Sequence, residues 1–151
     1  MYLSNLGRAR TLAYQIGGDA ADLDAAVDAL RAAVAALAPD EHVSARGTRM
    51  GSLSTALVLQ YRRSDDATDL DEAFRLAREA AEITPPHDHN AVDRALDLAQ
   101  THLLRHERSP DPADADTAAR LADEVLRATA DGDPDRERAL AIRDAARRTR
   151  A

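Results

Sequence analysis

The stretch Asp22-Leu23-Asp24-Ala25-Ala26 returns 47 residues later as Asp69-Leu70-Asp71-Glu72-Ala73. A weaker version, Asp114-Ala115-Asp116-Thr117-Ala118, follows after a further 45 residues. Because both offsets also align positions outside these stretches, the similarity is an internal repeat and not a chance match between alanine-rich segments. The sequence therefore predicts three repeats, at 1–41, 42–87 and 88–132. The aligned positions outside the stretches are Leu6, Leu53 and Leu98; Leu12, Leu59 and Leu104; and Asp19, Asp66 and Asp111.

A shorter offset of 44 residues connects Arg94-Ala95-Leu96 with Arg138-Ala139-Leu140. This match predicts the opening helix of a fourth repeat at 134–150. Such a helix would act as a cap, since the end of a repeat array needs its apolar face covered. We expect one helical-repeat domain over 1–151.

Each repeat is predicted to contain two helices. The first helices are expected at 2–16, 44–63 and 89–107, and the second at 23–37, 70–84 and 115–129. In each range apolar residues recur at the three- and four-residue spacing of an amphipathic helix. Alanine and leucine, the strongest helix formers, supply most of the 44% hydrophobic content, whereas aromatics make up only 3%. The predicted fold is all-α, an α-solenoid of three helix-turn-helix repeats with a C-terminal capping helix.

Several residues predict where these helices begin and end. Gly17-Gly18 should end the first helix. Asp22 and Asp69 are expected as N-caps of second helices, with Glu72 completing a capping box at the latter. Asp133 before Pro134 predicts the cap and first residue of the last helix. Prolines that cannot continue a helix should end the first two second helices, and these are Pro39, Pro85 and Pro86.

Charge and composition exclude several kinds of function. The net charge of -7 argues against a general nucleic-acid-binding surface. All 20 basic residues are arginine, and with no cysteine the chain has no disulfide and no thiolate metal site. Apolar stretches such as 32–38 are too short to cross a bilayer, and no signal-peptide core is visible at the start. We expect a cytoplasmic protein.

Candidate catalytic and metal sites are weak. His102 and His106 lie four residues apart on a predicted helix, a spacing that suits zinc, with Asp97 or Glu107 as further ligands. No third ligand converges by sequence, and the alternative is the polar end of a helix. Neither a phosphate-binding loop nor a Gly-x-Ser-x-Gly nucleophile motif occurs. We therefore expect no enzyme activity, no cofactor and no metal.

The second helices resemble those of tetratricopeptide repeats. Ala26-x3-Leu30-x2-Ala33 has the spacing of the small residues in that family, and Leu6-Gly7 matches the Leu-Gly of its first helix. The period of 44 to 47 residues is longer than the usual 34. This long form is similar to actinobacterial repeats, which often accompany CHAT peptidase or signalling ATPase domains. The resemblance implies a protein-binding scaffold.

In that family the first helices line a concave groove, so their polar residues would face a peptide or protein partner. The positions are Asn5, Arg8, Ser52, Thr55 and Gln100. The alternative is that these residues only solvate their helices. The repeated Asn and Lys of the carboxylate-clamping members are missing, so that kind of peptide is not predicted.

Other hypotheses stay open at this point. The chain could be a regulatory segment of a larger CHAT peptidase or signalling protein. Aligned on the second repeat, its first helix should begin about one turn before Met1, which indicates either a short natural start or a longer repeat array. Self-association through uncapped repeat ends is a third hypothesis. The arginines of the last helix, which include Arg150, could contact nucleic acid or an acidic partner, although a solvated final helix explains them as well.

Overall fold

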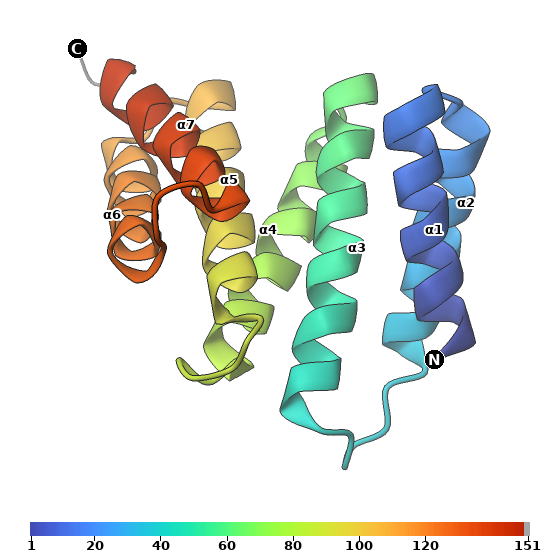
Figure 1. The fold of residues 1–151 in the computed structure, drawn as a ribbon. Helices are drawn as coiled ribbons and strands as arrows, with labels where there is room; N and C mark the ends of the chain where they lie inside the picture. Colours follow the sequence, from blue (N-terminus) through green and yellow to red (C-terminus); the bar gives the residue numbers. More distant parts are fainter. Residues whose placement is uncertain (150–151) are drawn as a thin grey trace. The chain divides into compact units, whose positions relative to one another are not determined.

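A computed structural model describes residues 1–149, and these residues form helices without any strand (Figure 1). The described helices are α1 (Tyr2–Gly17), α2 (Ala20–Ala35), α3 (Val43–Ser64), α4 (Ala67–Ile83), α5 (Ala91–Arg108), α6 (Pro112–Ala128) and α7 (Pro134–Arg148). Each expected helix corresponds to one of these. The all-α helical-repeat fold is therefore confirmed.

The helices are grouped in two compact units, which we describe separately. The first unit is Met1–Ile83 and the second begins at Thr84. In the first unit α2 packs against both α1 and α3, α3 packs against α4, and α1 also contacts α3. In the second unit α6 packs against both α5 and α7, while α5 contacts α7. Within each unit, a second helix therefore lies against its own first helix and against the next one along the chain.

Residues that the repeat register aligns occupy equivalent places. Asp22, Asp69 and Asp114 all lie in the first turn of a second helix. The last residues of the three quoted stretches, Ala26, Ala73 and Ala118, are each completely buried. These alanines pack into the core of their unit because a side chain larger than a methyl group would hold the helices apart. The register inferred from the sequence is therefore a structural repeat.

The crossing point of each hairpin in the first unit requires a small residue. A Cβ at Gly7 would lie 2.4 Å from Leu30 Cγ and 3.3 Å from the carbonyl oxygen of Ala26. One repeat later Ser54, the aligned residue, donates a hydrogen bond of 2.8 Å to the carbonyl oxygen of Ala73. Both first helices thus approach the same backbone position of their second helix, and glycine at position 7 permits the closer contact.

The predicted N-caps of the second helices were wrong by one turn. The helices begin at Ala20, Ala67 and Pro112, and the capping carboxylates are those of the aligned residues Asp19, Asp66 and Asp111, which accept from the backbone N–H two residues on at 2.9 Å. Asp22 and Asp69 lie inside the first turn, where a negative charge is still favourable. Two suitable aspartates lay one turn apart, and the earlier one caps because helical backbone extends back to it.

The capping box at Asp69 is wrong for the same reason. Glu72 lies within α4 and its carboxylate accepts from the guanidinium of Arg31 in α2 at 2.6 Å. The ends expected at Gly17-Gly18, Pro85 and Asp133 are confirmed, whereas α2 ends at Ala35, four residues before Pro39. Gly18 follows α1 with a φ of 74°, Asp133 caps α7 ahead of Pro134, and α4 ends before Pro85. The Asp133 carboxylate caps α7 by accepting a hydrogen bond of 2.9 Å from the backbone N–H of Asp135. Residue 150, in the expected range of the last helix, lies outside the described residues.

Candidate partner-binding surface

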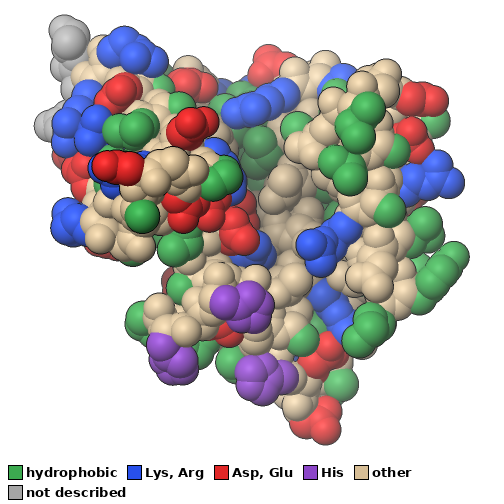
Figure 2. Space-filling model, viewed as in Figure 1, with side chains coloured by type: hydrophobic (Ala, Val, Ile, Leu, Met, Phe, Trp, Pro, Cys, Tyr) green, Lys and Arg blue, Asp and Glu red, His purple; other side chains and the backbone are tan. Residues whose placement is uncertain are grey.

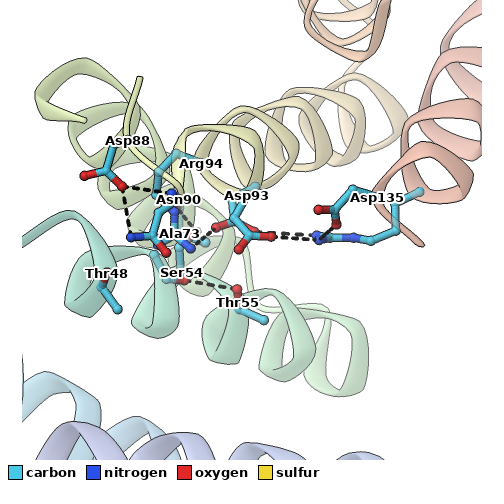
Figure 3. Close-up of polar contacts among 12 residues, drawn as sticks. Thr48, Ser54, Thr55, Ala73, Asp88, Asn90, Asp93, Arg94 and Asp135 are labelled. Atoms are coloured by element: carbon cyan, nitrogen blue, oxygen red, sulfur yellow. Dashed lines mark hydrogen bonds and ion pairs between the residues drawn. The ribbon is translucent and has the colours of Figure 1, made fainter. Parts of the chain in front are cut away.

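Four of the five predicted binding residues lie in the first unit, on two helices that contact each other. Asn5 and Arg8 are exposed on α1, and Ser52 and Thr55 are half-buried on α3. The Thr55 hydroxyl, labelled in Figure 3, donates to the carbonyl oxygen of Gly51 at 3.0 Å. That bond stays inside its own helix, so the hydroxyl oxygen can still accept a hydrogen bond from a ligand.

The two first helices of this unit differ in charge from the two second helices. The charged side chains of α1 and α3 are all arginines, whereas most charged side chains of α2 and α4 are carboxylates. Basic side chains are visible at the surface over α3 and toward α1 in Figure 2. The arginines are Arg8, Arg10, Arg46, Arg49, Arg62 and Arg63, and the carboxylates are Asp22, Asp24, Asp28, Asp69, Asp71, Glu72, Glu79 and Glu82. The unit therefore has a basic first-helix layer in a chain whose net charge is -7.

Some arginines of this layer neutralise carboxylates of their own unit. Arg10 pairs with Asp22 at 2.6 Å, Arg63 pairs with Asp24 at 2.7 Å, and Arg49 pairs with Glu41 at 2.5 Å. A fourth, Arg46, donates to the carbonyl oxygen of Ala38 at 3.5 Å.

Arg8 and Arg62 are different. Both are exposed, and neither has an ion pair or side-chain hydrogen bond with any residue in 1–149. Their charges are therefore available to a ligand. Sequence reasoning selected Arg8 through the family resemblance but missed Arg62. The signal that could have found it is the absence of any acidic residue from 43–64.

In the second unit, Gln100 is half-buried on α5. One turn before it lies Asp97, an acidic residue whose side chain is unusually well buried. Asp97 occupies the position that the repeat register aligns with Asn5 and Ser52, yet it was considered only as a zinc ligand. Its carboxylate lies 3.4 Å from Arg94 and 3.7 Å from Arg138 of α7. The side chains of Asp97 and Arg94 are each only 10% exposed.

Arg138 holds several carboxylates together (Figure 3). Its guanidinium lies 3.5 Å from both Asp93 on α5 and Asp135 on α7, in addition to its contact with Asp97. Burial raises the pKa of Asp97 to about 6, against the opposing effect of Arg94 and Arg138. The cluster therefore joins α5 to α7 and makes that contact sensitive to pH.

The two histidines considered as zinc ligands have other contacts. His102 Nδ1 lies 2.6 Å from Asp114 Oδ1 on α6. His106 is buried, and its Nδ1 lies 3.0 Å from the backbone nitrogen of Asp111 and 2.8 Å from its carbonyl oxygen. His106 is thus part of the packing around the start of α6. Residues 1–149 contain no group of three side chains placed to hold a metal ion.

Wider comparisons add no assignment. No described helix is both long enough and apolar enough to cross a membrane. The chain matches no protein-family model, no curated protein and no solved structure.

Proposed function

We propose that this chain is a protein-binding scaffold built from long-period tetratricopeptide-like repeats, and that its first helices bind an acidic segment of a peptide or protein. The observation that carries the proposal is the basic layer of α1 and α3, in which Arg8 and Arg62 have no partner in the described chain. An acidic segment would supply the missing carboxylates. A cytoplasmic location is part of the proposal, and fractionation of host cells tests it.

The hydroxyl group of Thr55 favours a peptide backbone as the ligand, because its oxygen can accept a hydrogen bond from a backbone N–H. The two arginines lie about seven residues apart in the helix register, roughly 10 Å along the helix axes, and the axes of α1 and α3 lie a further roughly 10 Å apart sideways. An extended segment with two carboxylates about four residues apart spans the combined distance of roughly 14 Å. The binding role involves no chemical conversion of the ligand.

The affinity expected from this surface is modest. Exposed ion pairs each contribute about 0.2–1 kcal/mol, and a guanidinium can hold a carboxylate with two parallel hydrogen bonds. Two such pairs with a few backbone hydrogen bonds give a dissociation constant on the order of 100 µM. Because the attraction is between exposed charges, it should weaken steeply as salt rises.

The proposal is tested with a fluorescein-labelled dodecapeptide of alternating glutamate and serine, titrated with the whole chain and followed by fluorescence anisotropy. The double variant Arg8→Ala/Arg62→Ala should bind roughly two- to thirtyfold more weakly, because two exposed ion pairs together contribute about 0.4–2 kcal/mol. The matched control is Arg127→Ala/Arg148→Ala, which removes two exposed arginines without a described ion pair from α6 and α7 and changes the net charge equally. Equal loss in both variants would mean that only net charge matters, and the assignment to the first helices would be wrong.

A further inference from the structure

The exposed large hydrophobic residues of the described chain are concentrated on one helix. Five of the six lie on α1 or at its N-cap, and the sixth is the first residue of α3. Hydrophobic side chains at the surface over α1 are visible in Figure 2. Scattered single residues of this kind are normal, but a cluster on one helix marks an interaction surface. The six residues are Met1, Tyr2, Leu3, Leu12, Ile16 and Val43.

Three of these residues belong to a regular stripe, which we call the α1 seam. The seam consists of Tyr2, Asn5, Ala9, Leu12 and Ile16, which recur at alternating intervals of three and four residues and are all exposed. Tyr2 is 76% exposed, Leu12 56% and Ile16 81%. Such intervals place side chains along the line where one helix of a coiled coil meets its partner. The α1 seam is therefore shaped to pack against another helix.

The equivalent positions on α3 show which helix this face contacts in the next hairpin. Shifted by one repeat, the seam becomes Arg49, Ser52, Ala56, Leu59 and Arg63. Here Ala56 is fully buried and α3 packs against α2 of the preceding hairpin. The two end positions reach that hairpin, since Arg49 donates to the carbonyl oxygen of Ala33 at 3.4 Å and Arg63 pairs with Asp24. The face is thus the established contact between successive hairpins.

On α1 the two arginines of that contact are replaced by Tyr2 and Ile16. A helix like α2, with a carboxylate at the position of Asp24, would leave that charge opposite Ile16 without a partner. A contact between two copies of one surface has the opposite requirement, because charges of a single sign on that surface would be brought close to charges of the same sign. The α1 seam contains no charged side chain. Its chemistry therefore fits a second copy of the same seam better than it fits another acidic hairpin.

Within residues 1–149, a second copy cannot bind to α6 in the way that α3 binds to α2. The face of α6 that corresponds to the α3-binding face of α2 is covered by α7, whose Arg147 pairs with Asp123 of α6 at 3.1 Å. We propose that two copies of the chain associate symmetrically through their α1 seams. Ala9 is the midpoint of the seam, so two copies of Ala9 face each other whether the helices run parallel or antiparallel. Leu12 and Ile16 supply the apolar contacts on one side of it.

The dimer should be weak, because a seam of about two heptads buries much less than the roughly 800 Å² per partner of a stable complex. Sedimentation velocity of the intact chain from about 5 µM to 1 mM should show a reversible monomer–dimer equilibrium with a dissociation constant on the order of 100 µM. The association should strengthen in added sodium sulfate, because apolar burial is favoured there. Peptide binding through arginine should weaken under the same conditions.

Two substitutions locate the interface. Ile16→Glu should raise the dissociation constant at least about tenfold, whereas Gln15→Glu should leave it within about twofold. The neighbouring control adds the same charge at an exposed site of α1 outside the seam. Because the chain has no cysteine, Ala9→Cys introduces a single thiol that should form a disulfide-linked dimer under mild oxidation. The same change at the exposed Ala25 of α2 should link far less.

A chain that sediments as a monomer up to 1 mM would overturn the proposal. Equal weakening by Ile16→Glu and Gln15→Glu would also overturn it, as would equal cross-linking at positions 9 and 25. Circular dichroism spectra that match the wild type ensure that a lost dimer is not a lost fold.

Discussion

Replacing Gly7 with alanine adds one methyl group at the place where α1 crosses α2. That methyl would lie 2.4 Å from Leu30 Cγ, 2.8 Å from Leu30 Cδ2 and 3.3 Å from the carbonyl oxygen of Ala26. Leu30 is completely buried, so its side chain has no open space to enter. The neighbouring carbonyl belongs to the α2 backbone and can move only if the two helices separate.

The magnitude follows from two opposing terms. Alanine in a helix is about 1 kcal/mol more favourable than glycine. Overpacking a filled core by one methyl group costs about 1–3 kcal/mol, and contacts this short with a branched side chain and a backbone atom belong at the upper end. We therefore expect a net loss of about 1–2 kcal/mol in the free energy of unfolding, which corresponds to a fall in Tm of roughly 3–8 °C for a chain of this size.

The same helix provides a matched control. A Cβ at Gly17, the last residue of α1, would meet no atom within 4 Å. Gly17→Ala should therefore be neutral or stabilising by a few tenths of a kcal/mol. Urea unfolding followed by circular dichroism measures both variants. If Gly7→Ala is as stable as Gly17→Ala, the close crossing of α1 and α2 is wrong. A smaller cost of Leu30→Ala in the Gly7→Ala background than in the wild type would locate the conflict at this pair.

Three further variants test the polar contacts. Because the pKa of Asp97 is raised to about 6 in the folded state from its ordinary 3.8, the folded chain binds this proton more tightly, and stability from this group is lost as pH rises from 4 to 6. The free energy of unfolding of Asp97→Asn should therefore rise by up to roughly 3 kcal/mol relative to that of the wild type between pH 4 and pH 7. Urea unfolding at each pH measures this difference. Parallel curves of stability against pH would contradict the burial of the Asp97 carboxylate. Asp19→Ala should cost about 1 kcal/mol through loss of the α2 cap. Asp22→Ala, which removes an exposed ion pair with Arg10, should cost less, and the reverse order in thermal unfolding would restore Asp22 as the cap.

The helices and their pairing could be predicted because the same pattern of small and apolar residues recurs in each repeat. Ala26, Ala73 and Ala118 are forced to be small by the same helix contact in each repeat, so one register explains all three. The repeat pattern could not show which aspartate caps each second helix. Asp19 and Asp22 are both good capping residues one turn apart, and both recur, so local preference alone did not decide between them.

The candidate surface was less predictable, because it depends on which side chains find partners within the fold. Arg10 and Arg8 look alike in the sequence, but only Arg10 reaches a carboxylate of α2. Asp97 resembles any other helical aspartate until α7 brings Arg138 beside it. His106 similarly lies against the start of α6, a contact that requires the turn between α5 and α6 to be known.

The central claim is that the two helices of each hairpin cross each other at equivalent positions in successive repeats. A nuclear Overhauser spectrum of the chain with 13C-labelled alanine methyl groups tests it. The account predicts cross-peaks from the Ala26 methyl to the α protons of Gly7, and from the Ala73 methyl to the β protons of Ser54. If Ala73 instead contacts residues a full turn away, such as Met50 or Val58, without contacting Ser54, the shared register and the repeat architecture built on it would be contradicted.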